Sequence, residues 1–315
     1  MPTPVFLTVD TEFAWRHHAA GCDLETIYRR SLEPAGVGLS FQLARLAEHG
    51  LKACFFVDPM PALVYGLAPI ERIVDTILAA GQEVQLHLHP DWQGARIGDA
   101  GAGRGRADLH QHDAAEQLHL LSTARDLLVA AGAPPPVAFR AGSYAADDQT
   151  LAALAALGIH YDSSHNGAAA ASRIGLPRRH IAPVRRGVVE VPVTVIEDER
   201  DRLRTFQLCA LSAGESYDAL EHAAVSGHAA VTIVNHGFEL SNRAGTRPNR
   251  VHVRRFEALC RMLATMRDVL PTQHFATAPP MPLDHDDQPL SPDRLRTGWR
   301  RAQQLWSNLV EERAA

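Results

Sequence analysis

Short apolar runs alternate along the chain with segments in which apolar residues recur every three or four positions. The short runs are typical of buried strands, and the longer spacing is typical of amphipathic helices. The pattern predicts strands at 5–9, 52–57, 82–88, 137–140, 159–162, 188–195 and 229–235, with one more short run at 274–277. It predicts helices at 37–49, 70–80, 113–131, 147–157, 217–226 and 251–269.

The regular alternation of strand and helix predicts an α/β fold. Parallel strands need a long crossover between them, and a helix in each connection supplies it, so we expect a parallel sheet. Such a sheet either closes into a barrel or stays open with helices on both faces. The seven or eight strand–helix units favour a (β/α)7-8 barrel, which we expect to occupy residues 1–278.

A different pattern follows the expected barrel. Residues 279–290 are rich in proline and aspartate and are interpreted as a linker. Ser291 and Pro292 then predict the start of a final helix within 291–315, with Ser291 as its N-cap. Because the apolar residues of this segment follow helical spacing, we expect it to dock on the barrel or to form a dimer contact: Leu295, Trp299, Ala302, Leu305, Trp306 and Leu309.

The composition narrows the classes of function. Of the 315 residues 46% are hydrophobic, and the formal net charge is −5, with acidic and basic residues mixed along the chain. This distribution lacks the basic stripe that binds nucleic acid.

The first apolar run lacks the charged start of a signal peptide, and no window approaches the ~20 apolar residues of a membrane span, so we expect a cytoplasmic protein. The four cysteines lie far apart and are interpreted as buried thiols.

Reactive side chains occur where most of the predicted strands end. Taken singly, a buried aspartate or histidine is more often a cap or a hydrogen-bonded core residue than a catalytic group. The carboxyl ends of barrel strands, however, converge on one rim where active sites form, so a shared register favours a common site. The residues in this register are Asp10, Glu12, Asp58, His87, His89, Asp91, Arg140, Asp162 and His236.

Five motifs in the chain resemble those of a known family. LTVDTEF, GQEVQLHLHPDW, FRAGSY, YDSS and IVNHGF occur in this order, with KACFFVD between the first two. They are similar to the motifs of the polysaccharide deacetylase (NodB-like) family of carbohydrate esterases, over residues 5 to about 265. The resemblance implies a distorted β/α barrel and a metal-dependent removal of N-acetyl groups from amino sugars.

The first motif departs from the family at its metal-binding position. By resemblance Asp10 is the general base, but the next position, where the family has an acidic metal ligand, is Thr11. The nearest carboxylate is Glu12. Residues two apart on a strand point to the same side, so Asp10 and Glu12 can face one site, and Glu12 is the expected ligand.

The second motif leaves two candidates for one ligand position. The family has His-x-x-x-His, which places His87 at the first position and Asp91 at the second. The family register therefore favours Asp91, and a carboxylate binds zinc about as closely as an imidazole does. His89 lies two residues after His87, on the same side of an extended strand, so local geometry favours His89. Both remain candidates beside Glu12 and His87.

The remaining motifs supply catalytic groups by resemblance. Arg140 is expected to pair with Asp10, although Gly142 stands where the family has proline and the aromatic Tyr144 comes one position late. A backbone N–H near Ser143 or Tyr144 is the expected oxyanion donor. His236 is the expected general acid, and Asp162 is expected to line the groove.

These roles predict hydrolytic N-deacetylation of an N-acetylated amino sugar or glycan precursor, with a divalent metal, zinc above others, as cofactor. Asp10 is the expected base and His236 the acid. An amidase for a small non-sugar amide such as a ureide stays open, because aromatic content is low at 6%. A catalytically silent carbohydrate-binding barrel also stays open, because Thr11, Asp91 and Gly142 depart from the family pattern. The Gly- and Arg-rich loop 94–112 follows the second motif and is a candidate lid.

Overall fold

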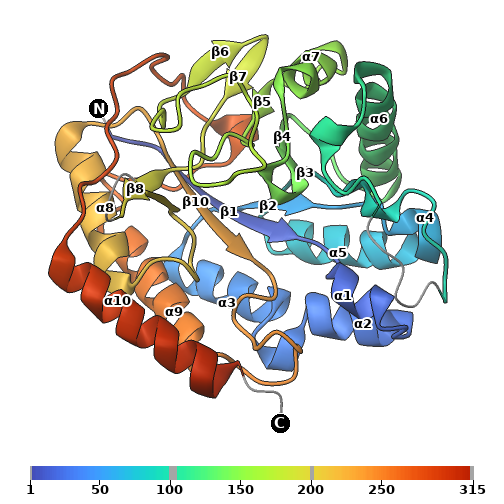
Figure 1. Ribbon diagram of the computed structural model, residues 1–315, viewed down its shortest axis with the longest axis horizontal. Helices are drawn as coiled ribbons and strands as arrows, with labels where there is room; N and C mark the ends of the chain where they lie inside the picture. The colour runs from blue at the N-terminus through green and yellow to red at the C-terminus, as the bar shows by residue number, and fades with distance from the viewer. Residues whose placement is uncertain (1, 99–104, 199–201, 313–315) are drawn as a thin grey trace.

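The strands form one large curled sheet with helices around it (Figure 1). The computed structural model describes residues 2–98, 105–198 and 202–312. The eight-stranded sheet has the order β10-β1-β2-β3-β4-β5-β7-β6, and only β6 is antiparallel to its neighbour. A separate hairpin pairs β8 with β9. The strands are β1 Val5–Thr11, β2 Cys54–Val57, β3 Glu83–Leu88, β4 Ala138–Ala141, β5 Tyr161–Asp162, β6 Val184–Arg186, β7 Val188–Glu190, β8 Val195–Glu197, β9 Leu203–Thr205 and β10 Val231–His236.

Helices connect the parallel strands and cover the outside of the sheet (Figure 1). The α-helices are α1 Trp15–Ala19, α2 Leu24–Ser31, α3 Leu39–His49, α4 Ala62–Tyr65, α5 Ala68–Ala79, α6 Ala114–Ala130, α7 Asp148–Ala156, α8 Ala213–Ser226, α9 Arg250–Thr265 and α10 Arg294–Trp306. Short 3-10 turns include η2 Pro90–Trp92, η3 Leu109–Gln111, η4 Gly142–Tyr144 and η5 Phe275–Thr277, and a π-helical turn, η6, covers Ser307–Glu311. Within the described ranges, none of these helices is long and apolar enough to span a membrane.

The register of the central strands brings the chemical groups together. Every residue of β1 is buried, which is typical of a parallel strand covered on both faces. Asp10 near the end of β1 lies opposite His236 at the end of β10. His87 on β3 lies opposite Arg140 on β4. The carboxyl ends of four strands therefore carry reactive side chains at one level of the sheet.

Aromatic packing fills the space enclosed by the curled sheet. Phe6 of β1 stacks on Phe275 at a ring distance of 4.3 Å, and Phe56 of β2 meets the same ring at 5.8 Å. The guanidinium of Arg140 lies 4.5 Å from the Phe56 ring centre. These buried rings form an apolar floor, so polar groups above them face a dry interior on one side.

The sheet closes irregularly beside β10. Thr194 donates its backbone N–H to Thr232 at 3.1 Å, and Leu208 donates to Val234 at 3.0 Å. The segment around β8 and β9 therefore covers the free edge of β10 by isolated hydrogen bonds instead of by a long strand. The barrel is distorted at this point.

The predicted element boundaries were wrong in three places. The expected strand 188–195 is divided, because β7 pairs with β5 while β8 turns away to pair with β9. The run 274–277 forms the 3-10 turn η5, because Glu83 accepts the backbone N–H groups of Phe275 and Ala276. The cap of α10 is Asp293, whose side chain accepts from the N–H groups of Leu295 and Arg296, in place of Ser291.

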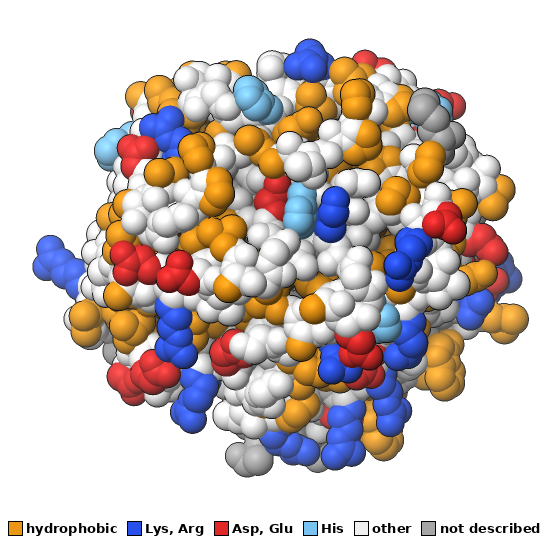
Figure 2. Space-filling view, turned by 180° about the vertical axis from the view of Figure 1, so that it is seen from behind, with side chains coloured by type: hydrophobic (Ala, Val, Ile, Leu, Met, Phe, Trp, Pro, Cys, Tyr) orange, Lys and Arg blue, Asp and Glu red, His pale blue; other side chains and the backbone are white. Residues whose placement is uncertain are grey.

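Two further regions bear on the sequence expectations. The candidate lid 94–112 lies partly outside the described residues, and its described part includes η3 and an ion pair of 2.6 Å between Arg106 and Glu116. On the face shown in Figure 2, acidic and basic side chains are interspersed with hydrophobic ones. This agrees with the mixed charge pattern of the sequence.

Candidate active site

A carboxylate and two imidazoles converge at the ends of β1 and β3. One ligand atom from each of Glu12, His87 and His89 lies within 4.8 Å of the other two. The Glu12 Oε2 atom is 3.2 Å from His87 Nε2 and 2.5 Å from His89 Nε2. One carboxylate and two imidazole nitrogens form a donor set typical of catalytic zinc, which uses three protein ligands and leaves a position open.

Neighbouring groups orient both histidines. The Nδ1 atom of His87 lies 2.7 Å from the carbonyl oxygen of Arg140, so the ring donates there and turns its Nε2 atom toward Glu12. Gly142 lies against the His89 ring, and a Cβ atom at this position would come within 2.4 Å of its Nδ1 and Cε1 atoms. The glycine that replaces the family's proline therefore makes room for His89. The three residues fit a divalent cation.

Electrostatics within the cluster favour an ionised Glu12 carboxylate that faces a protonated His89. Burial alone would raise the pKa of Glu12, but His89 and His87 keep that pKa well below its usual value. Burial alone would lower the pKa of His89, but Glu12, Asp58 and Asp91 raise it to about 9. A cation bound in place of the His89 proton would satisfy the same carboxylate.

Two more carboxylates lie near the cluster without belonging to it. Asp91, in η2, is buried and lines the same cavity as Glu12 and His89, but it is absent from the group of converging ligand atoms found among the described residues. The geometry thus favours His89 over Asp91 as the third ligand, against the family register. Asp58 ends β2, accepts from the Met60 N–H at 3.0 Å, and has its pKa raised by burial to about 7.

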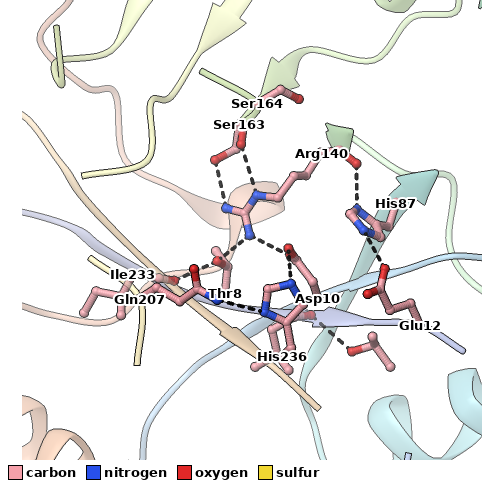
Figure 3. Close-up of polar contacts among 12 residues, drawn as sticks. Thr8, Asp10, Glu12, His87, Arg140, Ser163, Ser164, Gln207, Ile233 and His236 are labelled. Carbon is pink, nitrogen blue, oxygen red and sulfur yellow. Dashed lines mark hydrogen bonds and ion pairs between the residues drawn. The ribbon is translucent and has the colours of Figure 1, made fainter. Parts of the chain in front are cut away.

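Asp10 is oriented by a fully buried arginine (Figure 3). Arg140 Nη1 donates to Asp10 Oδ1 and to Thr8 Oγ1, each at 2.7 Å. Its Nε and Nη2 atoms donate to the backbone oxygen and hydroxyl of Ser163, both at 3.0 Å. Burial alone would raise the pKa of Asp10, but Arg140, with His87 and His236, lowers it. Asp10 is therefore ionised at neutral pH and cannot rotate freely.

His236 lies on the other side of Asp10, and its Nε2 atom is 3.7 Å from Asp10 Oδ2. Its Nδ1 atom is 2.7 Å from Glu239, which also accepts from Gln207. Burial alone would lower the pKa of His236, but Glu239, Asp10 and Glu12 raise it to about 9. The imidazole is thus a cation at neutral pH, with its Nε2 proton directed toward Asp10.

Asp162 lies beneath the site and does not line the cavity described below. It is fully buried, and it accepts from the Ser164 hydroxyl at 2.7 Å and from the Ser164 N–H at 3.2 Å. Its neighbour Glu190 has a pKa that is raised well above its usual value by burial and by the Asp162 charge. This pair positions the loop after β5, on which Ser163 meets Arg140.

The turn after β4 has an unusual backbone. Ser143 and Tyr144 have φ angles of 55° and 60°, in a region that costs a non-glycine residue of order 1–3 kcal/mol. The Tyr144 hydroxyl is buried and has no hydrogen-bond partner among the described residues. Strained backbone of this kind tends to occur at functional sites. The position of Tyr144 as oxyanion donor stays a prediction.

A cavity of about 140 Å³ opens beside Glu12 and His89. Its walls combine four aromatic residues with charged ones that include two arginines, and the lining residues are Glu12, Phe13, Ala14, Trp15, Arg16, His89, Asp91, Trp92, Phe238 and Arg243. Arg16 lies 4.9 Å from the Phe238 ring centre and donates from Nε to the Arg243 carbonyl at 2.8 Å. The cavity therefore offers apolar contact and positive charge near the candidate metal ligands.

Sequence reasoning missed several residues of this site. Glu239 follows His236 by three positions in IVNHGFEL, and an acidic residue so close to a strand-end histidine is a signal that could have identified it. Arg16 and Phe238 carry no local signal, because only the folded chain brings α1 and the loop after β10 together.

Comparison with known proteins reveals likeness at the level of structure. No protein-family model matches the chain, and no curated protein matches it. A solved structure from Mycobacterium smegmatis, described as a candidate polysaccharide deacetylase, is 18% identical, with a TM-score of 0.55, and the match covers 91% of this chain and 95% of the other.

Two further solved structures align over most of the chain with lower scores. A family 4 carbohydrate esterase from Streptomyces lividans, in complex with acetate, has 15% identity and a TM-score of 0.45, covering 92% of this chain and 98% of the other. A peptidoglycan deacetylase from Bacillus subtilis has 13% identity and a TM-score of 0.38, covering 99% and 98%. The predicted fold class is confirmed: this chain has the distorted β/α barrel fold of the polysaccharide deacetylases, with an added C-terminal helix.

Proposed function

We propose that this protein is a hydrolytic N-deacetylase that acts on an N-acetylated amino sugar or glycan precursor and depends on a divalent cation, with zinc the expected ion. The observation that carries the proposal is the position of Glu12, His87 and His89 beside the Asp10–Arg140 pair, at the strand ends of this barrel. A fold alone would not support it, because one fold hosts many functions.

Glu12, His87 and His89 would hold the cation. When bound, the cation supplies a Lewis acid for the amide carbonyl and lowers the pKa of water at the site. Arg140 keeps Asp10 ionised, so Asp10 can accept a proton from the attacking water. The water oxygen then forms a bond to the acetyl carbon.

His236 acts as the general acid, on the other side of Asp10. Its protonated Nε2 donates to the nitrogen of the departing amine as the C–N bond breaks, and Glu239 stabilises the imidazolium that carries this proton. The products are acetate and a free amino sugar. Each proton that Asp10 accepts and His236 donates is restored by exchange with solvent.

The test is acetate release from a panel of N-acetylhexosamines and N-acetylated nucleotide sugars, with ureides in parallel. We expect acetate from at least one sugar after loading with zinc. Asp10→Asn and His236→Gln should each lower kcat by about 10²–10⁴. Asp126→Asn, at an exposed carboxylate on α6, is the matched control and should leave kcat unchanged.

Other outcomes contradict the proposal in distinct ways. Turnover of a ureide without turnover of any acetylated sugar would identify an amidase for small amides. The small cavity, of about 140 Å³, makes this the principal rival. Binding of sugars by the zinc-loaded protein without any turnover would identify a silent carbohydrate-binding barrel.

A further inference from the structure

Helix α10 contacts the barrel through its polar side. Its buried residues are Thr297 and Arg300. Arg300 donates from Nε to Glu215 at 2.8 Å and from Nη2 to Asp198 at 3.1 Å. Directly after the helix, the Ser307 hydroxyl accepts from the Asn249 side chain at 2.9 Å. Hydrogen bonds and ion pairs, and not apolar packing, therefore attach this helix to the barrel.

The apolar side of α10 points away from the barrel. In Figure 1 the helix lies at the rim of the molecule with α8 and α9 on its inner side. The outer side of α10 and of the η6 turn that follows it carries large apolar residues with much of their surface exposed: Leu295 86%, Trp299 63%, Leu305 60% and Trp306 58% on α10, and Leu309 50% and Val310 40% on η6. A surface helix normally buries its apolar stripe, so this orientation is inverted. Two of the four tryptophans of the chain are exposed here.

The exposed stripe is large enough to be an interface. With about 150–250 Å² for a whole aromatic side chain, these residues expose on the order of 600 Å². That equals the largest apolar patches of typical monomers, which are often functional. A standard protein interface buries about 800 Å² on each partner, so this stripe would supply most of one half.

The spacing of the stripe fits another helix. Positions 295, 299, 302, 306 and 309 are alternately four and three residues apart, which is the seam spacing of paired helices. Beside the seam, a cleft of about 440 Å³ separates α10 from α9 and can receive an apolar side chain from a partner. Its lining includes Trp299 and Trp306 together with residues of both charges, Arg250, Arg254 and Glu311.

We propose that α10 is the contact surface of a symmetric dimer of this chain, in which the two α10 helices pack along this seam. In a two-fold contact the same patch serves both partners, so the arginines and the glutamate of one cleft can face their opposite charges in the other copy. An anionic lipid surface fits less well, because the carboxylate of Glu311 lines the cleft beside the stripe. The proposal does not depend on the proposed function.

The test is the mass of the full chain in solution at micromolar concentration, by sedimentation or light scattering. We expect the wild type to have the mass of a dimer. Trp306→Glu should weaken the dimer at least tenfold and yield monomers, because it places a charge within the seam. Val225→Glu is the matched control: Val225 is 83% exposed on α8, and its variant should remain a dimer. Circular dichroism of each variant reports whether it is folded.

Two results would overturn the dimer. One is a wild type that is monomeric across this concentration range, and the other is a folded Trp306→Glu variant that keeps the wild-type mass. Flotation with phosphatidylglycerol vesicles provides a third arm. A monomeric wild type that floats with the vesicles, while Trp306→Glu does not, would identify a lipid surface as the occupant and exclude the second copy.

Discussion

Position 142 must be glycine because the ring of His89 packs against it. Alanine at this position would place a Cβ atom within 2.4 Å of that ring and displace a candidate ligand. We expect Gly142→Ala to weaken metal binding about 10–100-fold, a range typical of changes behind metal ligands. Competition with a chelator measures this. Gly298→Ala, where the added Cβ meets nothing within 4 Å, should bind metal as the wild type does.

The choice between His89 and Asp91 is a second prediction for single residues. Because Glu12 lies 2.5 Å from His89 Nε2, we expect His89→Ala to lose stoichiometric zinc and Asp91→Ala to retain it. Elemental analysis of the purified variants measures this directly, without an activity assay. Zinc lost from Asp91→Ala and kept by His89→Ala would restore the ligand set that the family register favours.

Glu239 is expected to set the pH range of His236. Its carboxylate opposes the effect of burial and contributes to a His236 pKa of about 9. A raised pKa means that the protonated acid is present at neutral pH and is lost only as the pH rises through about 9. Glu239→Gln should therefore move the basic limb of the kcat profile to lower pH. A fall in kcat without any shift of this limb would indicate a purely structural role.

Much of this site could be predicted from the sequence, because strand ends are visible in the hydrophobic pattern. Asp10, Glu12, His87 and His236 each follow an apolar run, and the structure places them together. The sequence did not decide whether His89 or Asp91 is the ligand, because Pro90 begins a 3-10 turn whose direction depends on the packing of Trp92. Asp162 was expected to line the groove, and the structure shows a fully buried side chain outside the cavity beside Glu12, because burial depth cannot be read from a motif.

At the scale of elements, the triad of Arg300, Asp198 and Glu215 attaches α10 to the barrel. Removing one charged residue from a buried ionic group leaves the opposite charges of the other members uncompensated. We expect Arg300→Met to lower the free energy of unfolding by about 3 kcal/mol. Denaturant unfolding measures this. Arg294→Met, at an exposed position on the same helix, should change stability by no more than about 0.5 kcal/mol, and equal effects from the two variants would refute the argument.

Elements were predictable where local pattern and tertiary structure agree. Strands β1, β2 and β10 are mostly apolar runs and β3 alternates polar with apolar residues, and all four were found close to their true limits. Helices α1 and α2 have only five and eight residues, too few for an apolar period to reveal them. The sequence predicted the final helix but did not show which of its sides faces the barrel. The reason is that Asp198 and Glu215, the partners of its polar side, lie far away in the sequence.

The attachment of α10 implies an order of events during folding of the whole molecule. Arg300 is separated from its two acidic partners by 85 and 102 residues, and its charge is costly to bury before both are in place. We expect pulse-labelled hydrogen exchange to show protection of β1 and β2 before that of α10. Simultaneous protection would contradict this order. The outer tryptophans then reach their final positions only on a finished barrel, so association of two chains follows folding and does not drive it.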